Sequence, residues 1–270
     1  MSAPAAAVAL LPSSPPAAVP DPVREALSAL APADPSLLER RSLLRRADTK
    51  FLVRAEALAP LLRALAADHA VLLAAGEPIA TYETLYFDVP ELRGYDDHVR
   101  GRAPRCKVRA RHYPERRVSF LEVKRKTNRG RTEKARRPHP FGEVALSDDE
   151  VAWALALTGW PGWALLPQAW TRFRRITLVG RSSAERVTVD LDLALHLDGA
   201  RPGRRLPGLA VVEVKQPRAD PRSPAVLALR SAGARPRSMS KYAVAMGLLA
   251  RGVRRNRLLP ALREIERYGS

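Results

Sequence analysis

The chain has 270 residues, enough for one large domain or two small ones, and 46% of them are hydrophobic, which excludes wholesale disorder. Its 46 Lys and Arg against 28 Asp and Glu give a formal net charge of +18, which predicts a polyanionic partner such as nucleic acid, anionic lipid or a phosphate compound. The single Cys106 excludes a disulfide framework, and five scattered histidines without an HxxxH pair argue against a His-based zinc site. We expect a protein of the reducing cytoplasm whose ligand is negatively charged.

Residues 1–22 are rich in Ala and Pro and predict a disordered leader, so a single folded domain is expected over 23–270. Short helical pieces over 21–45 are interrupted by Pro32 and Pro35. The apolar spacing over residues 54–75 then predicts an amphipathic helix that carries His69 on its surface.

Alternating segments predict a run of strands that makes up most of the remaining chain. The expected strands are 43–53, 79–88, 104–113, 118–126, 167–179, 186–195 and 209–215, and the later helices are 224–232, 238–251 and 256–267. A basic loop is expected over 127–140 and a polar connection over 197–208. This order favours an α+β fold in which helices pack outside an antiparallel sheet.

Residues 151–170 carry no charge and are long enough to span a bilayer. They contain a Gly-Trp-Pro-Gly turn, and Ser147 with Glu150 forms a capping box that begins a helix. We therefore expect a short buried helix, a turn and an incoming strand, and no membrane span.

Charged side chains recur at every second position of the predicted strands, and alternate residues of a strand share one face. In the strand 104–113, Arg105, Lys107, Arg109 and Arg111 point one way, and small apolar residues including Cys106 point the other way. The same alternation gives Arg46, Asp48 and Lys50; Glu122, Lys124 and Lys126; Arg172 and Arg174; Arg186, Thr188 and Asp190; and Glu213 with Lys215. An ordinary sheet with one wet face also alternates, but these faces are nearly pure cation. Closure of the sheet with these faces inward would give a barrel with a positive lumen.

Lysine is rare in this chain, with seven residues against 39 arginines, as expected of a GC-rich genome. The seven are Lys50, Lys107, Lys124, Lys126, Lys134, Lys215 and Lys241. Most of them lie on the charged strand faces. Because an ammonium is a compact point charge and a guanidinium a planar fork, this clustering favours phosphate contacts for the lysines.

These segments resemble the VTC domain, the polyphosphate polymerase branch of the triphosphate tunnel (CYTH-like) metalloenzymes. The matching pieces are RRxDxKF at 45–51, LYFD at 85–88, RxKxRxRxY at 105–113, FLEVKRK at 120–126, Lys134 with Arg136, WxRF at 170–173, RVTVD at 186–190, VVEVK at 211–215 and SKYAVAMG at 240–247. They occur in the family's order and cover about residues 40 to 250.

The resemblance implies an antiparallel β-barrel, the triphosphate tunnel, that transfers the γ-phosphoryl group of ATP to a growing polyphosphate chain with Mn²⁺ or Mg²⁺. It implies catalytic roles for Lys107, Arg109, Arg111, Lys124, Arg172 and Arg186. It implies phosphate binding by Lys50, Arg105, Lys126, Lys134, Arg136, Lys215 and Lys241, and metal binding by Glu213. Arg46 and Asp48 stand where many tunnel enzymes carry a glutamate pair, which argues against a two-metal hydrolytic site.

Three other functions stay open from the sequence. The same tunnel would suit a hydrolase of tripolyphosphate or nucleoside triphosphate, or a module that binds polyphosphate without catalysis. A nucleic-acid-binding protein would fit the net charge, but few aromatic residues lie near the basic strands and no recognised binding motif is present. We therefore expect ATP and polyphosphate as partners and no specific nucleic acid.

Overall fold

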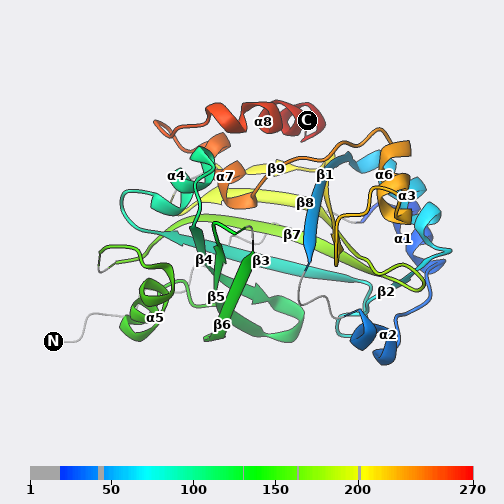
Figure 1. Cartoon of the computed structure of the whole chain (residues 1–270), viewed down its shortest axis with the longest axis horizontal. Coiled ribbons are helices and arrows are strands. Elements are labelled where there is room, and N and C mark those ends of the chain that lie inside the picture. Colours follow the sequence, from blue (N-terminus) through cyan, green and yellow to red (C-terminus); the bar gives the residue numbers. More distant parts are fainter. Residues whose placement is uncertain (1–18, 42–45, 130, 163, 200–201, 270) are drawn as a thin grey trace.

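The computed structural model describes residues 19–41, 46–129, 131–162, 164–199 and 202–269, and within them a single antiparallel sheet organises the chain (Figure 1). Its strands are β1 (Ala47–Arg54), β2 (His69–Val71), β3 (Ile79–Asp88), β4 (Arg105–Tyr113), β5 (Val118–Lys126), β6 (Thr132–His139), β7 (Leu166–Gly180), β8 (Arg186–Leu197), β9 (Arg204–Leu206) and β10 (Leu209–Gln216). The strand order is β1-β10-β8-β7-β3-β4-β5-β6, with β2 paired to β7 and β9 paired to β8. The α+β class is confirmed.

Helices lie on both sides and at the ends of this sheet (Figure 1). They are α1 (Asp21–Ser28), α2 (Pro35–Arg40), α3 (Leu58–Leu65), α4 (Arg93–Arg100), α5 (Asp148–Thr158), α6 (Pro224–Ser231), α7 (Lys241–Leu249) and α8 (Leu259–Gly269), with single 3₁₀ turns at Ala55–Ala57, Pro114–Arg116 and Asn256–Leu258. The predicted capping box is present at α5, where Ser147 Oγ accepts from the Glu150 amide and Glu150 accepts from the Ser147 amide. Among the described residues, no helix is long and apolar enough to cross a membrane.

The sheet curls but stays open, which corrects the predicted closed barrel. Its two outermost strands, β1 and β6, are not hydrogen-bonded to each other. The outer edge of β1 is paired with another segment of the chain. The Arg237 amide donates to the Lys50 carbonyl at 2.7 Å, and Pro236 forms an isolated β-bridge with Phe51. On the other side, Pro138 of β6 has no amide hydrogen to donate. The curl still brings Lys124 Nζ of β5 within 4.0 Å of Asp48 Oδ2 of β1.

The convex face of the sheet supplies most of the apolar core. Side chains of β3, β4 and β5, including Leu85, Val108 and Leu121, are buried with Ala154 of α5. Around β1, β10, β8 and the far half of β7, the convex face is instead covered by α1, α3 and α6. Cys106 is 3% exposed on this face, as expected of a core residue.

One end of the concave face is closed by α4, α7 and α8. Asp88, at the end of β3, is fully buried and accepts hydrogen bonds from the Gly94 and Tyr95 amides at 2.9 Å and from the Tyr242 hydroxyl at 2.8 Å. Burial raises the pKa of Asp88, while these donors act in the opposite direction. Asp88 therefore ties the start of α4 and the first turn of α7 to the sheet.

Four local predictions differ from the structure. The basic loop 127–140 contains the strand β6, because pairing with β5 outweighs the low strand propensity of its charged residues. The helix predicted over 54–75 ends at Leu65, since residues 69–71 pair with β7. Inside the predicted polar connection, Arg204–Leu206 pairs with β8. Of the predicted leader, residues 1–18 lie outside the described residues, and α1 begins at Asp21 with Val19 already buried.

Candidate functional site

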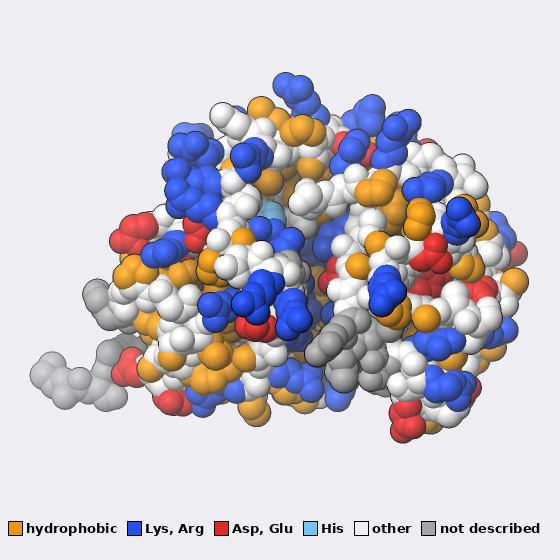
Figure 2. All heavy atoms as spheres, in the orientation of Figure 1, with side chains coloured by type: hydrophobic (Ala, Val, Ile, Leu, Met, Phe, Trp, Pro, Cys, Tyr) orange, Lys and Arg blue, Asp and Glu red, His pale blue; other side chains and the backbone are white. Residues whose placement is uncertain are grey.

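The predicted charged positions of β1, β10, β8, β4, β5 and β6 share the concave face of the sheet. Lys50 pairs with Glu213, which pairs in turn with Thr188. On the other arm, Lys107 pairs with Lys124, and Lys124 pairs with Lys134. Figure 2 shows Lys and Arg side chains gathered in and beside a hollow in this face of the molecule, between the strands labelled β5–β6 and β1 in Figure 1.

All but one of the predicted site residues occupy this concave face. They are Lys50, Arg105, Lys107, Arg109, Arg111, Lys124, Lys126, Lys134, Arg136, Arg186, Glu213 and Lys215 on the strands, with Lys241 at the start of α7. The exception is Arg172, which pairs with Glu83 across the convex face, with Arg172 Nε 3.3 Å from Glu83 Oε1. The prediction that Arg172 joins the cluster is therefore wrong, because its strand presents Phe173 and Arg175 to the concave side.

Arg175 is the principal site residue that the sequence analysis missed. Its Nε and Nη2 donate to the two oxygens of Asp190 at 2.6 and 2.8 Å, and its guanidinium lies over the rings of Tyr82 and Phe173. Lys241 Nζ contacts the same carboxylate from α7. Asp190 is 3% exposed, and although burial opposes ionisation, Arg175 and Lys241 lower its pKa. The arrangement fixes two cations on a buried carboxylate.

Glu122 plays the equivalent part on β5. It is 1% exposed, Arg109 donates to its Oε2 from Nε at 2.8 Å and from Nη2 at 2.7 Å, and Lys134 contacts its Oε1. Burial would raise the pKa of Glu122, but Arg109, Arg111 and Lys134 lower it to about 2. Glu122 therefore stays ionised and orients Arg109 and Lys134 into the concave space.

Glu213 lies between two lysines on the facing arm. Lys50 Nζ is 2.7 Å from one Glu213 oxygen and Lys215 Nζ is 2.9 Å from the other, while Lys215 also donates to Thr188 Oγ1 at 2.9 Å. Burial lowers the pKa of Lys215 to about 8, although Glu213 acts in the opposite direction. These contacts keep the carboxylate of Glu213 ionised beneath the hollow.

The donor set around Glu213 fits a Mg²⁺ or Mn²⁺ ion only when phosphate is present. These ions take one or two carboxylates together with substrate phosphate oxygens and water. Both Glu213 oxygens contact ammonium groups in the structure. A metal ion can bind Glu213 only if Lys50 and Lys215 pair with other anions instead. A polyphosphate chain would supply those anions.

Several concave-face cations have no carboxylate to balance them. Among the described residues, Lys107 forms no ion pair, and burial together with Lys124 and Lys50 lowers its pKa well below the ordinary value. Arg186 has a buried Nε without a hydrogen-bond partner in the described chain, and burial with Arg46 nearby lowers its pKa. Like-charged neighbours on adjacent strands destabilise a sheet. A bound anion would relieve that repulsion.

A cavity of about 200 Å³ opens beside these cations on the arm formed by β7, β8, β10 and β1. Its lining residues are Arg46, Leu72, Tyr82, Arg175, Thr177, Arg186, Thr188 and Lys215. None of these is acidic, so the side chains around the space are cationic, hydroxyl-bearing or apolar. A larger cavity of about 470 Å³ lies on the convex side between α1 and β3, and it is lined mainly by apolar residues.

His98 is a second residue near this face that the sequence analysis missed. It lies on α4, and burial together with Lys107 and Arg105 lowers its pKa to about 2. The ring is therefore neutral at pH 7 and adds no charge to the basic face. The sequence analysis did not predict α4, and without this helix His98 could not be placed beside the basic face.

The solved structures that are similar to this chain resemble it only weakly, as three of them show. The PH1012 protein of Pyrococcus horikoshii is 14% identical over 70% of this chain and 90% of its own, with a TM-score of 0.38. A candidate adenylate cyclase of Bacillus halodurans is 13% identical over 73% and 94%, with a TM-score of 0.47. A candidate adenylyl cyclase of Hippeastrum, described as having a dominant triphosphatase activity, is 14% identical over 73% and 93%, with a TM-score of 0.42. At these scores the likenesses carry no argument about this chain.

A comparison with family models gives a clearer result. No curated protein sequence matches the chain. The family model of the VTC domain does match, over residues 45–146, which contain β1 to β6 and thus one complete arm of the concave face. The resemblance drawn from the sequence motifs is confirmed for residues 45–146, where the chain matches the VTC domain.

Proposed function

We propose that the concave face binds the phosphates of ATP and of polyphosphate, and that the protein is a metal-dependent polyphosphate polymerase. The observation that carries this proposal is the 200 Å³ cavity lined by Arg46, Arg175, Arg186 and Lys215 without an acidic residue. The VTC-domain match supports the same substrate class. The proposal also implies a cytoplasmic setting, where ATP is available.

In the proposed reaction, a terminal oxygen of the polyphosphate chain attacks the γ-phosphorus of ATP. A new P–O bond forms as the bond to the β-phosphate oxygen breaks, and ADP leaves. Such transfers depend on alignment and on cations near the three equatorial oxygens. Arg175 and Arg109 suit this task because Asp190 and Glu122 hold their guanidinium groups in place before the substrate binds.

The remaining concave-face residues have separate roles in this proposal. Lys107 and Arg186 would neutralise phosphate directly, since no described carboxylate forms an ion pair with either. Glu213 would hold Mn²⁺ or Mg²⁺, which would offset the negative charge of the phosphates. Lys50, Arg105, Arg111, Lys124, Lys126, Lys134, Arg136, Lys215 and Lys241 would contact the rest of the phosphate chain.

The test is to incubate the protein with ATP and Mn²⁺ and to separate the products by gel electrophoresis. We expect long-chain polyphosphate together with ADP. The Arg186→Met variant should lose most of this activity, whereas Arg174→Met, which changes a cation on the convex face of β7, should retain it. Release of orthophosphate without polymer would identify a hydrolase, and binding without turnover would identify a polyphosphate-binding module. Either result contradicts the polymerase proposal.

A further inference from the structure

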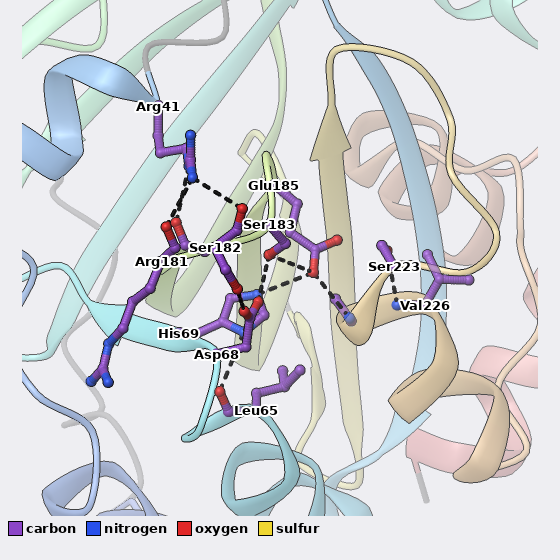
Figure 3. Close-up of polar contacts among 12 residues, drawn as sticks. Arg41, Leu65, Asp68, His69, Arg181, Ser182, Ser183, Glu185, Ser223 and Val226 are labelled. Carbon is purple, nitrogen blue, oxygen red and sulfur yellow. Dashed lines mark hydrogen bonds and ion pairs between the residues drawn. The ribbon is translucent and has the colours of Figure 1, made fainter.

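A second cluster of ionisable side chains lies where β2, the β7–β8 turn and the start of α6 meet (Figure 3). Asp68 precedes β2, His69 is its first residue, and Glu185 immediately precedes β8. One ligand atom from each of the three lies within 4.8 Å of the others. His69 is fully buried rather than on a helix surface, which corrects the sequence-based expectation.

The hydrogen bonds of His69 leave one ring nitrogen without a partner. Its Nδ1 lies 3.3 Å from the carbonyl oxygen of Leu65 and 3.7 Å from Asp68 Oδ2, and both of these atoms can only accept. The proton of a neutral ring therefore belongs on Nδ1. The lone pair of Nε2 then faces Glu185 Oε1 at 3.3 Å, and Nε2 has no hydrogen bond within the described chain. In a buried site this contact needs a positive charge, either a second proton on the ring or a metal ion between the two groups.

The other buried histidine–glutamate pair shows what a satisfied arrangement looks like. His139 Nδ1 lies 2.8 Å from Glu150 Oε1, and His139 Nε2 lies 3.1 Å from the Glu143 carbonyl oxygen. Both nitrogens of His139 therefore have aligned hydrogen-bond acceptors. His69 lacks such alignment at Nε2.

We propose that Asp68, His69 and Glu185 form a divalent-metal site of the zinc type. Ligand atoms at zinc distances of about 2.0–2.1 Å in a tetrahedron lie about 3.3–3.4 Å apart, which matches the 3.3 Å between His69 Nε2 and Glu185 Oε1. One imidazole and two carboxylates are a ligand set that zinc accepts, with water or Ser183 Oγ in the fourth position. Asp68 Oδ2 lies 3.7 Å from Nδ1, so this side chain, which is 19% exposed, has to turn toward Nε2 when the ion binds.

The surrounding contacts orient these ligands in the manner of a metal site. Ser182 and Ser183 donate to the two oxygens of Asp68, and the Glu185 carboxylate accepts from the Ala225 amide and from Gln216 Nε2, both at 3.0 Å. An ion here would join β2, the β7–β8 turn and α6. The site is separate from Glu213, and the proposal does not depend on the proposed function.

The test uses the EDTA-dialysed full chain and Zn²⁺ as the probe. Equilibrium dialysis followed by elemental analysis should find about one equivalent of zinc in the wild type, and saturating zinc should raise the melting temperature by roughly 5 °C. Asp68→Asn and His69→Gln should bind zinc about 100-fold more weakly and lose the shift. His139→Gln, which changes the other buried histidine, should keep both the zinc equivalent and the melting shift. Glu213→Gln, although expected to lose polymerase activity, should keep the same two zinc readouts.

Asn has the same shape as Asp, and position 68 is partly exposed, so Asp68→Asn should fold. It therefore tests zinc binding even if His69→Gln does not fold. Zinc binding of equal strength in the wild type and in Asp68→Asn would overturn the proposal. So would the absence of stoichiometric zinc in the wild type, or zinc binding that only Glu213→Gln removes.

Discussion

The two faces of β4 and β5 differ as strongly as any two regions of the molecule. On the convex side Val108, Ala110 and Leu121 are fully buried against the α5 layer. On the concave side the same strands carry Lys107, Lys124 and their cationic neighbours, with Glu122 to balance them. Along β4 and β5, one face therefore stabilises the fold by apolar burial, while the other holds repelling charges in place for a ligand.

The largest effect on stability is expected from the convex face. Leu121→Ala should lower the free energy of unfolding by about 3 kcal/mol, because it leaves a cavity in a fully buried position. Urea denaturation would measure this. Tripolyphosphate affinity, measured well below the melting temperature, should not change. A large loss of affinity in the folded variant would mean that the two faces are not separable.

Lys107→Met should show the opposite pattern. We expect tripolyphosphate to bind about 30-fold more weakly, since this change removes a half-buried cation that is proposed to contact phosphate. The melting temperature should stay equal or rise, because the lowered pKa of Lys107 shows that its charge is unfavourable in the folded state. Calorimetric titration and thermal unfolding check both points. Arg125→Met, on the convex side of β5, is the matched control and should bind normally.

A smaller effect should distinguish lysine from arginine on the concave face. Lys107→Arg and Lys124→Arg should each lower activity several-fold, because the longer planar group cannot replace a point charge between crowded strands. Arg63→Lys, at an exposed ion pair with Glu25, should have no effect. Equal tolerance at all three positions would show that the lysine clustering reflects codon usage.

The smallest effect concerns pH. The pKa of Lys215 is about 8 in the folded protein, below its ordinary 10.5, so the folded protein loses this proton as the pH rises through 8. Tripolyphosphate affinity should therefore fall between pH 7.5 and 9, by at most about tenfold per pH unit. Lys215→Arg should lose the inflection near pH 8. An affinity that stays constant in the wild type would show that Lys215 does not face the ligand.

The sequence predicted correctly which side chains face the concave side in strands whose charged residues stand only at every second position. In β4 all four cations stand at odd-numbered positions. Because alternate residues of a strand share a face, they must lie on the same side of the sheet. In β7 arginines stand at both odd and even positions, at Arg174 and Arg175, and only the pairing with β3 and β8 decides which set faces the hollow. No local pattern contains that information.

Two other features could not be predicted from the sequence, for a different reason. They are the open edge of the sheet and the Asp68–His69–Glu185 cluster. Both depend on contacts between segments far apart in the chain, such as Arg237 on the edge of β1 and Glu185 beside His69. Propensity and periodicity describe neighbours along the chain, so they cannot place such pairs. The motifs between residues 45 and 146 did identify the VTC-domain resemblance, because most of them lie within a single strand.

The most direct test of the central claim compares two polyanions across a range of salt. Affinities for long-chain polyphosphate and for double-stranded DNA would be measured between about 50 and 200 mM salt. A concave phosphate site predicts that polyphosphate binding persists and competes with ATP, because its charges are partly buried and weakly screened. DNA, held only by outer charges, should be lost steeply over the same range. DNA binding as tight as polyphosphate binding at the higher salt, without ATP turnover, would contradict the account.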